Sequence, residues 1–349
     1  MPKGRYLVTI DCGTTNSRVY LVERSGKVLL SRNRKVGVKD TAQRGSNRYL
    51  KEQLKELLEE VLTQAKLTKQ DIALVLSSGM ITSELGIIEL PHLFAPTSMD
   101  DLASSITRVE GEESFDPEVQ LYLIRGIKNP YHPEQNDLRE LPKLDFMRGE
   151  ETQVAGLLRL YGQGISTAVI NLSSHTKCIP VDKKDRILGS ITTLSGQVFE
   201  AILKETMIGK SVLPVESSES IDPNAVPFSK EMAELAFQIV TEAGLLRSLV
   251  MPRFMDVLLK TTWTDRRKFL ECALAVDDLY ALRLFPSFEF PYGDRIFLVG
   301  PKSRCEIFTY YLKEKLRLSA QVQCISSAEE VANLSVQGAL FLAEKRGLL

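Results

Sequence analysis

Hydrophobic positions in this chain fall into two kinds of stretch. Short continuous apolar runs at 6–10, 19–22, 28–31 and 72–76 are typical of buried strands. Between them, residues 46–66 carry apolar side chains three to four residues apart, which is the spacing of one helix face. This alternation predicts an α/β unit in which a strand hairpin is followed by a helix and a further strand.

The same pattern returns in the second half of the chain, displaced by about 160 residues. An apolar run at 168–172 is followed by a Ser-rich turn, and residues 181–188 resemble residues 22–29. A recurrence this distant predicts two copies of one folding unit. We expect an N-terminal domain over 1–147 and a C-terminal domain over 148–349 that begins with a linking helix.

The other segments complete this organisation. Residues 86–145 are rich in proline, which disfavours long helices, and are expected to be irregular and to shape a substrate pocket or a surface excursion. The remaining expected elements are a strand at 119–124, helices at 148–161 and 196–208, a loop at 212–227, helical segments over 230–285, strands at 295–299 and 321–325, and helices at 305–317 and 329–345.

The turn between the first two strands carries the main candidate chemistry. Gly13 lets the backbone pass close to a ligand, and Thr14 and Thr15 offer hydroxyl and amide donors that suit phosphate oxygens. Asp11, at the end of the first strand, suits a hydrated Mg²⁺ ion. Arg18 is expected to brace the hairpin or to neutralise charge. An ordinary hairpin turn is the alternative that these residues alone leave open.

The second turn repeats this chemistry. Ser174, His175, Thr176 and Lys177 follow the second apolar run, and we expect them to meet phosphates from the second domain. Two such hairpins facing one cleft would hold a triphosphate from both sides. Gly300 lies in a late strand–turn–helix segment that suits a wall for adenine.

A further candidate edge follows the strand at 72–76. Ligands of open α/β sheets bind beyond the carboxyl ends of the strands, so Ser78, Gly79, Met80 and Glu84 are candidate substrate contacts. A plain strand-to-helix turn explains the same residues equally well.

The helix that begins after Arg148 opens with two carboxylates. Glu150 and Glu151 would offset the positive end of the helix dipole, which is the simpler explanation. The alternative is that one of them faces the cleft as a general base.

Charge and cysteine content narrow the class of protein. The chain has 44 basic and 45 acidic residues, so no broad field favours nucleic acid or an acidic membrane. Its five cysteines show no Cys-x-x-Cys spacing, which indicates reduced thiols in a cytoplasmic protein. No apolar run is long enough to cross a bilayer. The expected partner is a small molecule, and a homodimer is left open.

Three motifs, in this order, resemble the 2-dehydro-3-deoxygalactonokinase family: Asp11–Arg18, Met147–Gln153 and Ser174–Lys177. The resemblance covers nearly the whole chain. It implies two ribonuclease-H-like, or actin-like ATPase, domains around a nucleotide cleft, and ATP with Mg²⁺ as cofactors. It also implies phosphorylation of a small sugar acid or sugar.

The resemblance also assigns roles at the helix start. Gly149-Glu150 is similar to the Gly-Asp of related sugar kinases, so Glu150 is the expected base and Glu151 the second choice. Arg148 is expected to pair with a substrate carboxylate.

Four positions differ from the family pattern: Cys12 replaces a tryptophan, Ser173 a glycine, Glu84 an arginine and Gln197 a glutamate. They leave open a second hypothesis, a nucleotide-binding regulator of the same fold with weakened catalysis. Ser173, Glu84 and Gln197 favour the regulator, whereas intact Asp11, Gly13 and Glu150 favour the kinase. Glu84 predicts an acceptor other than 2-dehydro-3-deoxygalactonate.

Overall fold

The computed structural model describes residues 4–132, 134, 137–214 and 226–349. Packing groups the chain into two units. The first comprises Met1–Gly164, Lys183–Gly189 and Ala332–Leu349, and the second comprises Ile165–Asp182 and Ser190–Val331.

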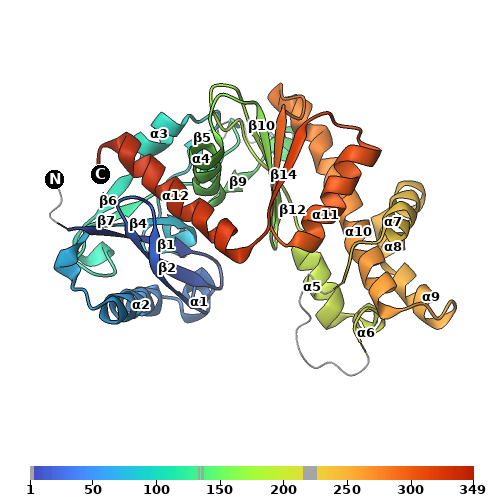
Figure 1. Ribbon diagram of the computed structural model, residues 1–349, viewed down its shortest axis with the longest axis horizontal. Helices are drawn as coiled ribbons and strands as arrows, with labels where there is room; N and C mark the ends of the chain where they lie inside the picture. Colours follow the sequence, from blue (N-terminus) through green and yellow to red (C-terminus); the bar gives the residue numbers. More distant parts are fainter. Residues whose placement is uncertain (1–3, 133, 135–136, 215–225) are drawn as a thin grey trace. The chain divides into compact units, whose positions relative to one another are not determined.

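A six-stranded sheet forms the centre of the first unit, in the order β3-β2-β1-β4-β7-β6 (Figure 1). β1 pairs antiparallel with β2 and parallel with β4, so the first hairpin lies beside the next strand of the chain. The strands are β1 (Tyr6–Cys12), β2 (Ser17–Glu23), β3 (Val28–Arg34), β4 (Ile72–Gly79), β6 (Thr107–Val109) and β7 (Leu121–Leu123).

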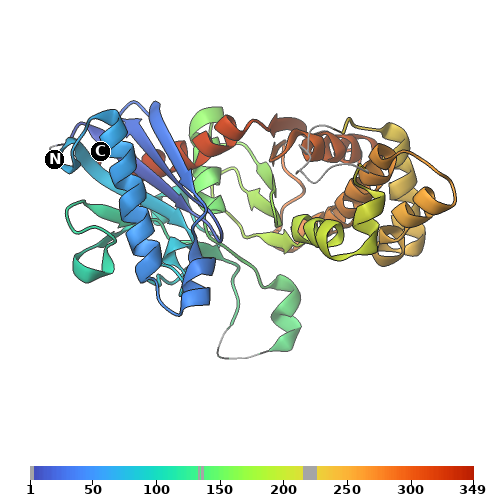
Figure 2. The same ribbon diagram turned by 90° about the horizontal axis from the view of Figure 1, so that it is seen from below.

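Helix α2 (Arg48–Ala65) covers this sheet with the apolar face that the sequence predicts (Figure 2). Leu50, Leu54 and Leu57 are among its fully buried side chains, and they join the strand residues in one core. β4 is buried along its whole length, because both of its faces are covered. The predicted hairpin, helix and strand are therefore confirmed. A shorter helix, α1 (Val38–Arg44), precedes α2 and was not predicted.

Helix α4 (Glu150–Tyr161) touches α12 (Ala328–Arg346) through the backbone, at residues of α12 that belong to the first unit. A Cβ on Gly338 would lie 1.8 Å from the Thr152 carbonyl oxygen, and one on Gly156 would lie 2.1 Å from the Leu334 carbonyl oxygen. Glycine is therefore required at both positions. This packing groups α4 with the first unit, whereas the boundary expected at 147/148 places it in the second domain.

The proline-rich segment holds only short elements, as the sequence predicts. A small sheet is formed by β5 (Leu93–Phe94), β8 (Ile127–Lys128) and β9 (Phe146–Met147). Figure 2 shows the 3₁₀ segment Leu138–Lys143 standing away from the main sheet of this unit. The remaining short elements of the first unit are α3 (Met99–Ser104) and the 3₁₀ turns Lys69–Asp71, Met80–Thr82 and Gly111–Glu113.

The second unit repeats the strand order of the first. Its sheet runs β12-β11-β10-β13-β14, with antiparallel β10–β11 and parallel β10–β13 pairs. The strands are β10 (Thr167–Leu172), β11 (Thr176–Val181), β12 (Ile191–Thr193), β13 (Arg295–Val299) and β14 (Gln321–Ile325). The α/β class, with one hairpin-led sheet in each of two units, is therefore confirmed.

Helices fill the rest of the second unit. The single helix predicted over 196–208 is wrong, because Thr206 adopts an extended backbone and its hydroxyl accepts the Ile208 N–H, which starts a second helix. The loop predicted over 212–227 lies mostly outside the described residues. The helices are α5 (Ser195–Glu205), α6 (Met207–Ser211), α7 (Lys230–Ala243), α8 (Leu245–Leu249), α9 (Met251–Val257), α10 (Trp263–Ala281) and α11 (Lys302–Tyr310); 3₁₀ segment Leu282–Phe288 extends α10 and π-turn Tyr311–Lys315 extends α11.

In the part of the chain that the structure describes, no helix combines the length and the apolar character that a membrane span requires.

Candidate functional site

The first hairpin turn is held from behind by the start of α1. The Gly13 carbonyl oxygen accepts the Val38 N–H at 3.3 Å, and the Thr14 carbonyl oxygen accepts the Lys39 N–H at 2.9 Å. In a trans peptide the C=O and the following N–H point in opposite directions, so the N–H groups of Thr14 and Thr15 point away from α1. Both threonines are exposed. The turn therefore presents amide donors outward, as a phosphate-binding turn must.

Gly37, which the sequence analysis did not single out, makes this arrangement possible. A Cβ at Gly37 would lie 2.5 Å from the carbonyl oxygens of both Gly13 and Thr14. Its backbone is extended, so the requirement is one of space and not of conformation. Only a residue without a side chain lets α1 approach the turn this closely.

Asp11 lies directly before the turn and opposite Arg18 in the β1–β2 register. The Arg18 Nη1 is 3.4 Å from the Asp11 Oδ2, so the two side chains form an ion pair across the hairpin. Burial raises the pKa of Asp11, and the Arg18 charge and hydrogen bond oppose that rise. The Asp11 side chain still keeps 27% of its surface exposed, which leaves an accessible carboxylate directly before the turn.

The end of β4 and the start of α4 meet beside Asp11. Gly79 has a φ of +90°, and a Cβ there would lie 2.5 Å from the Cys12 carbonyl oxygen and 3.5 Å from the Asp11 Oδ1. Gly149 has a φ of +112°, and its Cβ would lie 3.4 Å from the Gly79 Cα. These two glycines bring Glu150, the next residue after Gly149, to the same edge of the sheet as Asp11.

The two carboxylates of α4 have different surroundings. Glu151 is fully buried, and both of its carboxylate oxygens accept the Gly149 N–H, at 2.8 and 2.9 Å. Burial raises the pKa of Glu151 to about 8, the Glu150 charge adds to the rise, and backbone hydrogen bonds oppose it. Glu150 is partly exposed. Glu151 is therefore a buried cap of the helix start, and Glu150 is the carboxylate with access to solvent.

Arg148 is anchored within the first unit. Its Nη1 donates to the Thr82 hydroxyl at 2.7 Å, and its Nη2 donates to the Leu90 carbonyl oxygen at 3.1 Å. Burial lowers the pKa of Arg148, and nearby carboxylates, Glu151 first and then Glu84, oppose that change. The guanidinium is therefore fixed in position beside the edge formed by β4 and α4.

The other candidate substrate contacts at this edge differ in how deeply they are buried. Ser78 is buried and pairs with Asp11 in the β1–β4 register. Met80 packs against the hydrophobic core of the unit. Glu84 is exposed.

The second hairpin turn is also tied back to its own unit. The Ser174 carbonyl oxygen accepts the Gln197 N–H of α5 at 2.9 Å, and the Ser173 carbonyl oxygen accepts the Arg304 Nη1 at 2.8 Å. A Cβ on Gly196 would lie 2.4 Å from the Ser173 carbonyl oxygen, so α5 requires glycine here. The N–H groups of Ser174 and His175 consequently point outward, as in the first turn.

The four predicted residues of this segment separate into two pairs. Ser174 is exposed and His175 is partly exposed, whereas Thr176 and Lys177 are buried. The Thr176 hydroxyl donates to the Asp278 carboxylate at 2.9 Å, and the Lys177 Nζ donates to the Thr192 hydroxyl at 2.8 Å. Outward chemistry at this turn therefore comes from Ser174 and His175.

Gly300 lies at the end of β13, against the end of β10. Its φ is +150°, and a Cβ there would lie 2.7 Å from the Leu172 carbonyl oxygen. The strand–turn–helix segment thus packs directly behind the second hairpin. Its contact with adenine stays a prediction.

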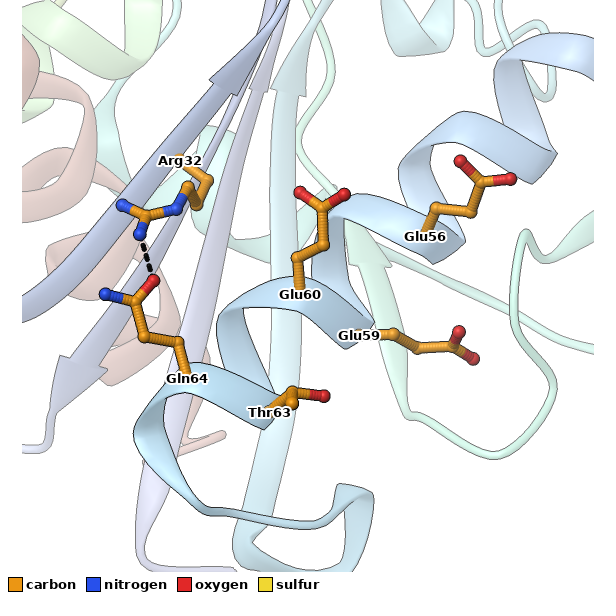
Figure 3. A pocket seen from close by; sticks show the side chains of 6 residues that line it. All are labelled: Arg32, Glu56, Glu59, Glu60, Thr63 and Gln64. Atoms are coloured by element: carbon orange, nitrogen blue, oxygen red, sulfur yellow. Dashed lines mark hydrogen bonds between the residues drawn. The ribbon is translucent and has the colours of Figure 1, made fainter.

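A groove between β3 and α2 is set apart from these turns (Figure 3). The carboxylates of Glu56 and Glu60 both pair with Arg34, and the Arg32 guanidinium donates to the Gln64 side chain. Among the described residues, no group of three or more His, Cys, Asp or Glu side chains is placed to hold a metal ion. Glu56, Glu60 and Gln64 of this groove are therefore each paired with an arginine side chain.

A family model described as 2-keto-3-deoxy-galactonokinase matches residues 11–334. The curated Rhizobium meliloti (strain 1021) protein named "Probable 2-dehydro-3-deoxygalactonokinase DgoK1" is 25% identical over 217 residues, which is 62% of each chain. The match thus spans less than two thirds of that relative.

Solved structures show the same fold. A Sinorhizobium meliloti protein described provisionally as a 2-dehydro-3-deoxygalactonokinase has a TM-score of 0.69 at 21% identity, covering 96% of this chain and 98% of its own. A reductive activator for a corrinoid, iron-sulfur protein has a TM-score of 0.51 at 15% identity, covering 99% of this chain and 62% of its own. Because the family model matches nearly the whole chain, this protein belongs to the 2-keto-3-deoxy-galactonokinase family.

Proposed function

We propose that this protein is an ATP-dependent carbohydrate kinase that phosphorylates a small sugar acid or sugar. Family membership supports this proposal. The observation that carries it is the construction of the two hairpin turns. In each turn, consecutive carbonyl oxygens are tied to the protein, so that outward amides remain for phosphate oxygens. The proposal is that the outward amides of these turns bind phosphate oxygens of ATP.

Mg²⁺ fits the residues of the first turn. Magnesium in phosphoryl-transfer sites is usually held by one or two carboxylates together with substrate phosphates and water, and does not need a full protein cage. Asp11 supplies a partly exposed carboxylate at the end of β1, directly before the turn that carries Thr14 and Thr15. We propose that Asp11 orients the hydrated ion, which would neutralise charge on the transferring phosphoryl group.

Glu150 is the proposed general base. A base must reach the hydroxyl whose proton it accepts, so geometry decides before pKa does. Glu151 is fully buried and occupied by the Gly149 N–H, which leaves Glu150 as the carboxylate of this pair with solvent access. Gly149 and Gly79 bring it next to the end of β4, where we propose that the acceptor binds.

The acceptor is proposed to lie along Ser78, Gly79, Met80 and Glu84, with the fixed Arg148 nearby. Arg148 already donates to Thr82 and Leu90, and its Nη2 also lies 3.4 Å from the His92 Nδ1, so a substrate carboxylate would meet its remaining donors. Glu84 is exposed and close enough to Arg148 to influence its pKa. A second carboxylate at this position disfavours a strongly anionic acceptor, so 2-dehydro-3-deoxygalactonate is not the expected preferred substrate.

Two measurements on the purified full chain test the proposal. Isothermal titration should detect Mg-ATP binding at millimolar concentration or below. ADP release should then increase when the correct acceptor from a panel of sugar acids and sugars is added. Absence of Mg-ATP binding would refute the kinase. Efficient turnover of 2-dehydro-3-deoxygalactonate would show that Glu84 does not restrict the acceptor.

A further inference from the structure

The two hairpin turns differ in what holds their carbonyl oxygens. Backbone N–H groups hold them in the first turn, whereas a side chain holds one of them in the second. In the first turn, two N–H groups of α1 hold the carbonyl oxygens of Gly13 and Thr14. The corresponding carbonyl oxygens of the second turn belong to Ser173 and Ser174. Only the Ser174 oxygen is held by a helix N–H, and the Ser173 oxygen is held by the Arg304 guanidinium at 2.8 Å.

Arg304 is itself fixed by a buried polar cluster. Its Nη2 donates to the Thr176 hydroxyl at 2.8 Å, to the Ser195 hydroxyl at 2.9 Å and to the Asp278 Oδ2 at 3.2 Å. These hydroxyls in turn donate to Asp278, at 2.9 Å from Thr176 and 2.7 Å from Ser195. These contacts fix the orientation of the guanidinium, and its Nη1 donates to the turn from that fixed position.

The cluster links four elements of the second unit. Thr176 opens β11, Ser195 opens α5, Asp278 lies in α10, and Arg304 lies in the first turn of α11. Asp278 is 1% exposed and its charge is balanced by Arg304, which is 20% exposed. A buried carboxylate with a paired, hydrogen-bonded cation is tolerated, whereas an unpaired one is costly. The position of Arg304 at the turn therefore depends on the packing of these four elements.

The orientation of one peptide follows from this contact. Because the Ser173 carbonyl points at Arg304, the Ser174 N–H points the opposite way, to the outer side of the turn. Ser173 also donates its hydroxyl to the His175 carbonyl oxygen at 3.0 Å. Each of the three carbonyl oxygens of the turn, from Ser173 to His175, thus accepts a hydrogen bond from within the unit.

We propose that Arg304 is a positioning residue that sets the second turn in its phosphate-binding shape, with Asp278 holding Arg304 in place. This inference rests on the proposed function, because it assumes that the outward amides of the second turn bind phosphate. Arg304 acts through the Ser173–Ser174 peptide and not by contact with ATP. Replacing Arg304 should therefore weaken ATP binding because the second turn loses its shape, and not because a positive charge is lost.

The test compares Arg304→Lys with the wild type. Lysine keeps the charge opposite Asp278, but it lacks the planar fork that bridges the turn and the cluster. We expect isothermal titration of the full chain to give a Kd for Mg-ATP at least tenfold higher than the wild-type value. The matched control is Lys302→Gln, which removes an exposed positive charge from the same helix turn and should change the Kd by less than twofold.

A second variant separates shape from folding. Arg304→Gln alone leaves Asp278 buried and unpaired, so its Tm without ligand should fall. The double variant Arg304→Gln/Asp278→Asn removes both charges and should regain much of that Tm, while its Kd for Mg-ATP stays raised. A purely structural role would instead restore the Kd together with the Tm.

The outcomes are distinct for the two proposals. Arg304→Lys binding Mg-ATP within twofold of the wild type would overturn the positioning role and leave the kinase proposal intact. A double variant with wild-type affinity would overturn it as well. If the wild type does not bind Mg-ATP, the proposed function fails, and the positioning role fails with it.

Discussion

Replacing Glu151 by glutamine should change how the stability of the protein depends on pH. The Glu151 pKa is raised from 4.5 to about 8 by burial, so the folded state binds a proton that the unfolded chain releases. This stabilisation is complete below pH 4.5 and is lost as the pH rises through 8. Glutamine keeps the shape of the protonated acid and has no charge to bury, so Glu151→Gln should not show this loss.

The size of the effect follows from proton linkage. One unit of pKa shift corresponds to about 1.4 kcal/mol. As the pH rises from 5 to 8, the unfolding free energy of the wild type should therefore fall by on the order of 3 kcal/mol relative to that of the variant. In a folding unit of ordinary size, this is roughly 6–12 °C in Tm.

Differential scanning calorimetry of both proteins from pH 5 to pH 8 measures this difference. The matched control is Glu150→Gln, at the neighbouring, partly exposed position. It removes the charge that adds to the raised Glu151 pKa, so it should reduce the pH dependence without abolishing it. Parallel loss of stability in Glu151→Gln and the wild type would refute the account of a buried, protonated Glu151.

Three further predictions concern the first turn and its neighbours. Gly79→Ala should destabilise the protein by about 2 kcal/mol or more in chemical denaturation, because its φ is +90° and the new Cβ would lie 2.5 Å from the Cys12 carbonyl oxygen. Gly45→Ala, also at positive φ but with open space, should cost less; equal costs would contradict the packing argument. Glu150→Gln should lower turnover by about 100-fold or more while Mg-ATP affinity changes only a few-fold, and near-normal turnover would place the base elsewhere. Asp11→Asn should reduce the rise in Tm that Mg-ATP produces, and an unchanged rise would exclude Asp11 from the metal site.

Local patterns along the chain predicted the two hairpins and most of the helices, because short apolar runs and helical spacing are properties of neighbouring residues. The glycines at positive φ were harder to interpret. Gly79 was proposed as a ligand contact, whereas its first requirement is the close approach of β4 to the Cys12 carbonyl group. Gly37 carried no local signal, since its role depends on α1 reaching a turn more than twenty residues earlier.

Asp278 and Arg304 were missed for the same reason. They lie in different helices, and only the fold of the second unit brings them together with Ser195 and Thr176. One signal was available in the sequence: Asp278 has the apolar Ala275 one turn before it in α10 and the apolar Leu282 one turn after it, directly past the end of α10. A carboxylate on an apolar helix face requires a partner, although the sequence does not identify which one.

Product detection tests the central claim most directly. The purified full chain is incubated with Mg-ATP and the panel of sugar acids and sugars, and phosphorus NMR follows the appearance of phosphomonoesters. The account predicts a new phosphomonoester in amounts equal to the ADP formed, with a rate at least about 100-fold lower in Glu150→Gln. Tight Mg-ATP binding without phosphorylation of any acceptor would contradict it and would favour a nucleotide-binding regulator of the same fold.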